Sequence, residues 1–200
     1  MNTNMKKCNS PYSASMTGCG FVFNEFNAVL PLLMEPNGKD LLKDEVRENR
    51  YLMMNSENTR KRCASELQKR YNAVPTSFWE YYINLSEEDK RIALLYSLLN
   101  AYQILKELHQ NVVEQQWLSI EKTLTGDNLL MELYNISSRD EFVDSWSDKT
   151  KEKIASWFQT VLIQVGMLAR QDQKLKPVKL TDNSWFVDNG EEWFLKACLI

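Results

Sequence analysis

Apolar residues recur every three or four positions along most of the chain, a spacing that gathers side chains on one face of a helix. The pattern is clearest near the C-terminal end, where Ile154, Phe158 and Val161 belong to one continuous stripe. Residues 36–38, with the sequence Pro-Asn-Gly, are typical of the turns between such stretches. We therefore expect helices over residues 23–33, 39–54, 57–71, 77–83, 86–108, 112–124, 128–134, 140–146, 148–169 and 191–198.

Glycine and proline are scarce, at six and five of 200 residues, which disfavours a fold with many strands and turns. Toward the C-terminus the helical pattern weakens, because residues 173–180 alternate around a proline and residues 184–187 are short and apolar. That region is expected to form a short β-hairpin or an extended segment. The predicted fold class is all-α, with an N-terminal helical subdomain over residues 1–84 and a C-terminal helical bundle with its tail over residues 85–200, packed as one compact unit.

The sequence shows neither an export signal nor a membrane-spanning segment. The residues after Lys6 and Lys7 are small and polar, whereas a secretory signal requires an apolar region there. The longest dense apolar stretches, residues 28–34 and 92–99, are much shorter than the ~20 residues that cross a bilayer. We therefore expect a cytoplasmic protein with no membrane partner. Its thiols are expected to be reduced, since no CxxC pair occurs among Cys8, Cys19, Cys63 and Cys198.

Side chains suited to catalysis or metal binding are sparse. His109 is the one histidine, so a multi-histidine metal site is excluded and any catalytic triad depends on that residue. Its place near the end of an expected helix favours a cation that complements the helix dipole. The acidic residues Asp140, Glu141 and Asp144 are interpreted as a helix start rather than a metal site. No phosphate-binding loop or nucleophile elbow occurs, so we predict a non-enzymatic protein without catalytic residues, metal or cofactor.

Positive charge is concentrated in one part of a chain whose formal net charge is -3. Residues 43–70 carry eight lysines and arginines against five aspartates and glutamates. Residues 1–79 have a net charge of +3, whereas residues 80–200 have a net charge of -6. This segregation favours a surface that faces a polyanion on one side of the protein.

Helical geometry sorts the basic residues by the direction they face. With Leu42 at zero and 100° per residue, Lys43, Arg47 and Arg50 fall at about 100°, 140° and 80°, on one flank of the apolar face. Such a row can follow the phosphates of a duplex, because neutralising each phosphate releases counterions whatever the base sequence. With the exposed positions of the next helix added, the predicted phosphate contacts are Lys43, Arg47, Arg50, Lys61, Arg62 and Lys69.

Part of the basic charge in the third expected helix is assigned to the fold. Arg60 and Arg70 fall close to its apolar face, where their stems are expected to pack. Glu66 lies four residues from both Arg62 and Arg70, which permits intrahelical ion pairs of about 0.2 to 0.5 kcal/mol. A solvated and partly self-neutralised surface therefore explains the charge equally well. No neighbouring helix is expected to offer side chains that read bases.

A polar run precedes the first expected helix at residues 12–18, with the sequence Tyr-Ser-Ala-Ser-Met-Thr-Gly. The hydroxyls of Ser13, Ser15 and Thr17 can contact phosphate or cap the helix, and physical reasoning alone favours the cap. We keep them as weaker candidates for DNA contact.

This run and the residues after it resemble the DUF1819 family, which includes the BrxA components of BREX bacteriophage-exclusion systems. The resemblance covers most of the chain in length and order. It implies an all-helical protein similar to the antitermination factor NusB, with a role in antiviral defence and in DNA binding, and it supplies no catalytic residues. The residues that carry it after the polar run are Phe23, Glu25, Phe26, Leu30 to Leu33, Arg60, Glu66, Leu67 and Arg70.

The residues and the resemblance together predict a cytoplasmic, non-enzymatic protein that binds double-stranded DNA mainly through the phosphate backbone and acts with other BREX components. Two alternatives remain open. One is a protein-interaction module whose basic surface meets an acidic partner. The other is RNA binding, which follows only from the similarity to NusB and is a weak inference, because a fold hosts many functions.

Overall fold

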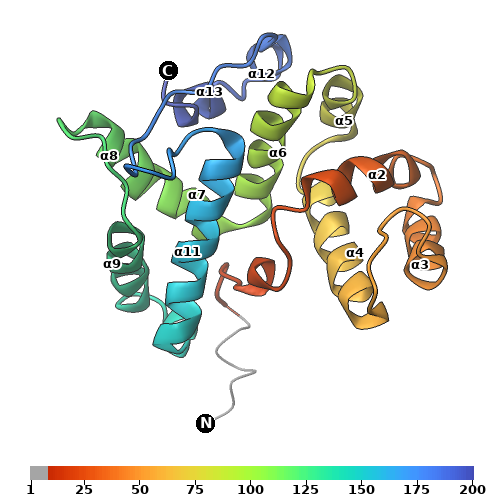
Figure 1. The fold of residues 1–200 in the computed structure, drawn as a ribbon, viewed down its shortest axis with the longest axis horizontal. Coiled ribbons are helices and arrows are strands. Elements are labelled where there is room, and N and C mark those ends of the chain that lie inside the picture. Colours follow the sequence, from red (N-terminus) through yellow and green to blue (C-terminus); the bar gives the residue numbers. More distant parts are fainter. Residues whose placement is uncertain (1–8) are drawn as a thin grey trace. The chain divides into compact units, whose positions relative to one another are not determined.

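The computed structural model describes residues 9–200, and its fold is all-α as predicted, with 65% of the residues in helices (Figure 1). The expectations for Lys6, Lys7 and Cys8 lie outside the described residues. Two compact units make up the described chain: residues 15–101 form one, and residues 9–14 with residues 102–200 form the other. The subdomain boundary expected between residues 84 and 85 stays a prediction.

The unit of residues 15–101 contains the basic part of the sequence. Helix α4 packs against four other elements of this unit: η1, α2, α3 and α6. Residues 92–99 of α6 are all buried, so that helix supplies much of the core. The elements of the unit are the 3₁₀-helix η1 (Ser15–Gly18), α2 (Phe23–Leu33), α3 (Gly38–Glu48), α4 (Glu57–Asn72), α5 (Thr76–Tyr82) and α6 (Glu87–Ala101).

Aromatic residues of α5 complete this core. The fully buried ring of Trp79 lies with its centroid 4.9 Å from that of Phe26 and 5.5 Å from that of Tyr82. Its indole N–H donates a hydrogen bond to the carbonyl oxygen of Tyr71 at 3.0 Å. Because buried aromatic pairs of this kind are strongly stabilising, α5 holds the C-terminal end of α4 firmly in place.

Helix α3 ends six residues earlier than predicted, and this changes the expected row of basic residues. Asn49 adopts the left-handed conformation, with φ 54°, in which asparagine often terminates a helix. The buried carboxylate of Glu45 then accepts hydrogen bonds from the backbone N–H groups of residues 50–52 at 2.8 to 3.1 Å. The prediction that Arg50 lies on this helix is wrong, since Arg50 lies in the loop that follows it, as does Met53, which is 76% exposed.

Gly38 allows α2 and α3 to approach each other closely. A Cβ atom at this position would lie 2.6 Å from the carbonyl oxygen of Leu32 and 2.7 Å from that of Leu33. We expect Gly38→Ala to lower the free energy of unfolding by about 1 to 3 kcal/mol, as overpacking commonly does, and urea denaturation measures this loss. Gly18→Ala is the matched control, because nothing lies within 4 Å of its added Cβ. An equal loss in both variants would contradict the close-approach explanation.

The second unit is built around α11, whose buried residues include Ile154, Phe158 and Val161, as their spacing predicts. Helix α11 packs against α9, which in turn packs against α10 and α7. The elements of this unit are α7 (Gln103–Leu108), the π-helical turn η2 (His109–Val113), α8 (Glu114–Leu118), α9 (Gly126–Ser137), α10 (Glu141–Asp144), α11 (Asp148–Val165), α12 (Ser184–Asp188) and α13 (Trp193–Ala197).

Capping side chains fix the starts of three helices in this unit. Thr125 caps α9 in a reciprocal capping box, and Ser147 caps α11. The carboxylate of Asp140 accepts a hydrogen bond from the N–H of Val143 at 2.8 Å, so the acidic trio does mark a helix start. Within residues 9–200 no three His, Cys, Asp or Glu side chains are grouped as metal ligands, and no helix there has the length and apolarity of a transmembrane span.

The C-terminal region is only partly extended. Two isolated antiparallel bridges join Leu168 to Leu175 and Thr123 to Lys174. Residues 184–187, which were expected to be part of a hairpin or an extended tail, instead form most of the helical turn α12. The reason is packing, because this turn buries the rings of Trp185 and Phe186.

His109 is fully buried in this unit rather than exposed as a cation at a helix end. Its Nε2–H donates a hydrogen bond to the carbonyl oxygen of Ala197 at 2.7 Å, and Nδ1 has no hydrogen-bond partner within the described residues. Burial lowers the pKa of the imidazole to about 4, so the ring is neutral at pH 7. The interpretation of His109 as a charge that complements the helix dipole is therefore wrong.

Candidate nucleic-acid interface

A groove of about 440 Å³ lies between α3 and α4. Four cations line it, three from α3 and one from α4, above the apolar side chains of Leu42, Val46 and Ala64. The groove therefore brings together three of the predicted contacts, Lys43, Arg47 and Lys61, from two different helices. We call the basic residues on the outer surface of these helices the basic face: Lys39, Lys43, Arg47, Lys61, Arg62 and Lys69.

The basic row on α3 consists of Lys39, Lys43 and Arg47, which are spaced four residues apart along one side of the helix. Lys39 takes the place that the sequence analysis gave to Arg50. Lys39 lies four residues before Lys43, and this spacing is visible in the sequence. The helical projection continued the row toward the C-terminus, to Arg50, and not toward the N-terminus. Arg50 is exposed beyond the end of α3, with its Nε 3.1 Å from the Glu48 carboxylate, and does not line the groove.

Acidic neighbours pair with the cations of the groove. The Lys43 ammonium lies 2.7 Å from the Asp40 carboxylate, and this hydrogen bond lowers the pKa of Asp40. Lys61 pairs with Glu57 at 2.7 Å, with the same effect on the pKa of Glu57. Arg47 forms an ion pair with Asp44. The basic face is thus partly self-neutralised, but exposed pairs stabilise a protein by only ~0 to 1 kcal/mol, so phosphate can replace these carboxylates.

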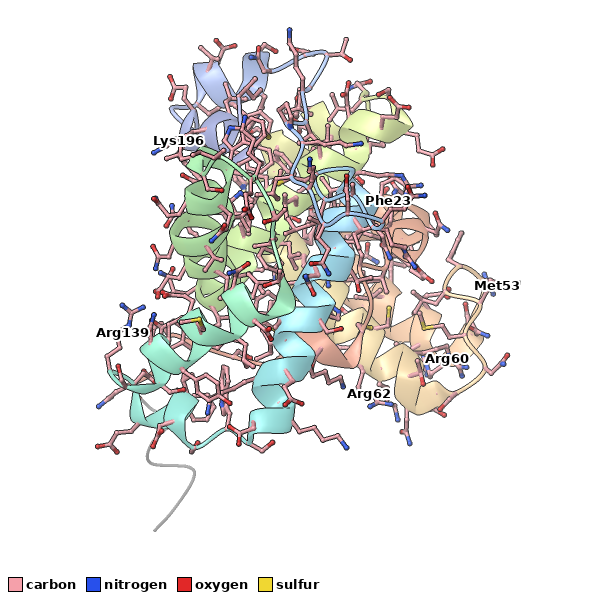
Figure 2. The ribbon with its side chains drawn as sticks, turned by 60° about the vertical axis from the view of Figure 1, so that its left-hand side comes forward. Phe23, Met53, Arg60, Arg62, Arg139 and Lys196 are labelled. Carbon is pink, nitrogen blue, oxygen red and sulfur yellow. The ribbon has the colours of Figure 1, made fainter. Side chains whose placement is uncertain are left out.

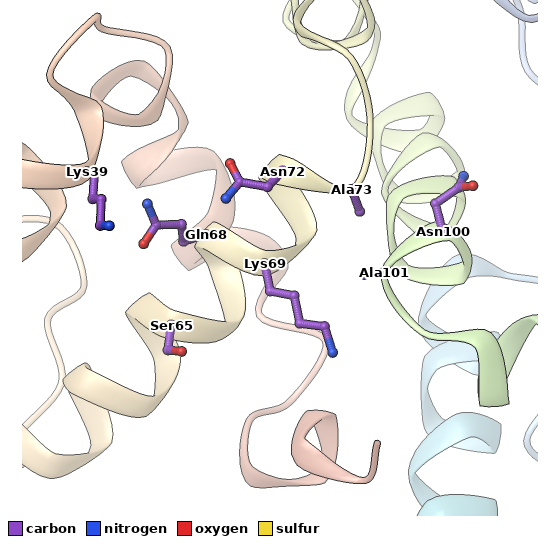
Figure 3. A pocket seen from close by; sticks show the side chains of 8 residues that line it. All are labelled: Lys39, Ser65, Gln68, Lys69, Asn72, Ala73, Asn100 and Ala101. Carbon is purple, nitrogen blue, oxygen red and sulfur yellow. The ribbon is translucent and has the colours of Figure 1, made fainter. Parts of the chain in front are cut away.

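Arg62 and Lys69 flank the outer side of α4. Arg62 is exposed on the surface in Figure 2 and makes no ion pair with any residue of the described chain. Lys69 is half-buried and lines a second hollow of about 570 Å³, shown in Figure 3. That hollow shares Lys39, Ser65 and Gln68 with the first groove, so the two depressions adjoin along α4.

Arg60 and Arg70 belong to the fold, as their positions near the apolar face of α4 predicted. Arg60 donates hydrogen bonds to the carbonyl oxygens of Val46 and Met54, each at 2.7 Å. Arg70 is fully buried and forms an ion pair with Glu66 at 2.8 Å. The Arg70 guanidinium is therefore inaccessible to a ligand, and that of Arg60 is held by backbone carbonyl groups of its own unit.

The polar run of residues 12–18 is anchored by its larger members. Met16 is fully buried in η1, which packs against α4. Tyr12 belongs to the other unit, where its buried hydroxyl donates a hydrogen bond to the Glu107 carboxylate at 2.9 Å. These contacts support the structural interpretation of the run. Phosphate contact by the hydroxyls of this run remains a prediction. Ser15 is exposed, whereas Ser13 and Thr17 are half-buried.

The fold and the site define an all-helical protein that carries a basic helix pair on its surface. Residues 10–185 match the model of the BrxA family, and the chain belongs to that family. The BrxA part of the resemblance is thereby confirmed, whereas the DUF1819 label and the similarity to NusB stay predictions.

One relative by sequence and one solved structure are similar to this chain. The chain is 21% identical over 189 residues to the protein called BREX protein BrxA of Paramagnetospirillum magneticum (strain ATCC 700264 / AMB-1), covering 93% of this chain and 95% of the relative. Its fold is similar to the crystal structure of an uncharacterized protein from Magnetospirillum magneticum, with a TM-score of 0.78 and 19% identity. That likeness covers 95% of this chain and 98% of the other, and at such identity it concerns the fold alone.

Proposed function

We propose that this chain is a non-enzymatic, DNA-binding component of a BREX phage-defence system and contacts the duplex mainly through its phosphates. Membership of the BrxA family and a relative that carries the name BREX protein BrxA support the role in defence and a partnership with other BREX components. The observation that carries DNA binding is the convergence of four cations on the groove between α3 and α4.

The spacing of these cations suits a polyanion. Lys39, Lys43 and Arg47 follow one another at about 6 Å along the axis of α3. This is close to the axial distance between every second phosphate of one DNA strand, which rises ~3.4 Å per nucleotide. Because Lys61 faces the same groove from α4, phosphates can be contacted from both helices. Such contacts give affinity and register without base specificity.

Gel-shift titrations across salt concentrations test this proposal. The logarithm of the association constant is expected to fall linearly with the logarithm of salt concentration, by about 0.9 for each phosphate contact. We expect the variant Lys43→Glu, Arg47→Glu, Lys61→Glu to bind at least tenfold more weakly and to have a slope reduced by about 1 for each lost cation.

The matched control reverses two exposed charges in the other unit, Lys149→Glu and Lys153→Glu, which lie on α11. It changes the net charge of the protein without touching the groove. A salt slope near zero in the unaltered protein would contradict the proposal. Equal losses of DNA affinity in the groove variant and in the control would contradict the assignment of the site to the groove, because a general effect of net charge would then explain both losses.

The apolar floor of the groove favours one alternative function. Leu42, Val46 and Ala64 would suit an acidic segment of another BREX component that also carries apolar side chains. Purification of the tagged protein with its neighbours, with and without nuclease, separates the two functions. Associations that survive nuclease, together with no gel shift, would favour this alternative, and competition between duplex DNA and RNA would decide whether RNA is the ligand.

A further inference from the structure

Helix α4 presents a row of polar side chains that phosphate contact alone does not use. With Ser65 at zero and 100° per residue, Lys61, Gln68 and Asn72 all fall within about 60° on one side. The four residues therefore form one line along the outer surface of the helix. Cys63, Leu67 and Arg70 lie on the opposite side of the helix and are buried, so the polar row faces away from the core.

The two amides of this row are available to a ligand. Asn27, Asn84 and Asn100 each donate a side-chain hydrogen bond to the carbonyl oxygen four residues before them, at 2.7 to 2.9 Å. Gln68 and Asn72 make no such bond, and within residues 9–200 neither amide has a hydrogen-bond partner. Asn72 is exposed and Gln68 half-buried.

The surroundings of the row are also suited to a nucleic acid. Lys61 within the row and Arg62 and Lys69 beside it carry positive charge, and Figure 3 shows Gln68 on α4 extending toward Lys39 on α3. The two hollows adjoin at Ser65 and Gln68, so the row borders both of them. A helix of 16 residues is about 24 Å long, and the major groove of B-DNA, ~12 Å wide, admits an α-helix.

We propose that α4 enters the major groove of DNA and reads base edges through Gln68 and Asn72, with Ser65 as a third contact. This inference rests on the proposed DNA binding and adds sequence preference to it. The amides of glutamine and asparagine form paired hydrogen bonds with N6 and N7 of adenine. Gln68 and Asn72 are about 6 Å apart along the helix axis, close to two base-pair steps. The preferred site therefore contains two A·T pairs separated by about one base pair, and α4 is the base-reading helix that the sequence analysis did not find.

Selection of duplexes from a random-sequence library by the full chain tests the inference. The unaltered protein is expected to enrich a motif with two such A·T pairs and to bind it at least tenfold more tightly than a scrambled duplex. The variant Gln68→Ala, Asn72→Ala is expected to lose this preference while keeping the salt slope of the unaltered protein. Asn72→Asp, which replaces the amide donor by a carboxylate, is expected to lose the adenine preference at one position.

Each outcome has a distinct meaning. The control Gln110→Ala, Gln115→Ala removes two exposed amides of the other unit and is expected to leave the motif unchanged. Salt-dependent binding without any enriched motif would overturn base reading and leave the phosphate contacts standing. An enriched motif without adenine, or one retained by the double variant, would overturn the roles of Gln68 and Asn72. Absence of binding to every duplex would overturn both proposals.

Discussion

Replacing Arg70 by methionine is expected to lower the free energy of unfolding by about 3 to 5 kcal/mol, the cost of breaking a buried ion pair from one side. The Arg70 Nε donates to Glu66 Oε1 at 2.8 Å, while Nη1 and Nη2 donate to the carbonyl oxygens of Phe21 and Gly20 at 2.6 and 3.3 Å. Methionine would leave the buried Glu66 carboxylate and both carbonyl oxygens without this donor. Urea denaturation followed by circular dichroism measures the loss.

Two further variants separate this effect from a general sensitivity of α4. Arg62→Met removes an exposed arginine from the same helix and is expected to change stability by no more than ~0.5 kcal/mol. Adding Glu66→Gln to Arg70→Met should recover part of the loss, because the uncompensated buried charge is then gone. If Arg62→Met and Arg70→Met destabilise the protein equally, the buried pair does not have the importance assigned to it.

Protonation of His109 alone is expected to lower the free energy of unfolding by about 3 kcal/mol between pH 6.5 and pH 4. The slope is ~1.4 kcal/mol per pH unit. Burial lowers the pKa of this imidazole in the folded protein to about 4 from its ordinary value of 6.5. Below pH 6.5 the unfolded chain takes up a proton that the folded chain does not, so acid favours unfolding. The contribution is fully present above pH 6.5 and is lost as the pH approaches 4.

The variant His109→Gln isolates this contribution from that of the carboxylates. Its side-chain amide can still donate to the carbonyl oxygen of Ala197, but it does not titrate. We expect the free energy of unfolding of the variant to depend less steeply on pH in this window, whatever its absolute value. Because His109 is the one histidine, an NMR titration reports its pKa directly, and a value near 6.5 would contradict the prediction.

Periodicity predicted the helices that bury one face, such as α11, and helical projection assigned Arg60 and Arg70 to the fold. Both follow from the local chain alone. The early end of α3 does not, because it depends on the buried carboxylate of Glu45 and its hydrogen bonds to the following loop. The burial of His109 likewise depends on Ala197, 88 residues further along the chain.

The candidate site was predicted only in part, because it too depends on how the helices pack against each other. Projection of each helix placed Lys43, Arg47 and Lys61 on exposed surfaces, but only the packing of α3 against α4 shows that they share a groove. Arg50 was included because the helix that corresponds to α3 was predicted to extend to residue 54. Gln68 and Asn72, the base contacts proposed above, are uncharged, so a prediction based on clusters of positive charge does not include them, although amides can also pair with base edges.

Arginine and lysine are not interchangeable in α4. Arg60 spans the carbonyl oxygens of Val46 and Met54, and Arg70 reaches Glu66 together with the segment before α2. Only a planar guanidinium offers several donors at the angles these acceptors require, whereas the ammonium of Lys61 or Lys69 is a compact point charge. Exchange between the two residue types should therefore be silent on the outer surface of the helix and harmful at Arg60 and Arg70. Arg60 and Arg70 are thus the basic residues of α4 that build the fold, whereas Lys61, Arg62 and Lys69 carry positive charge on its outer surface.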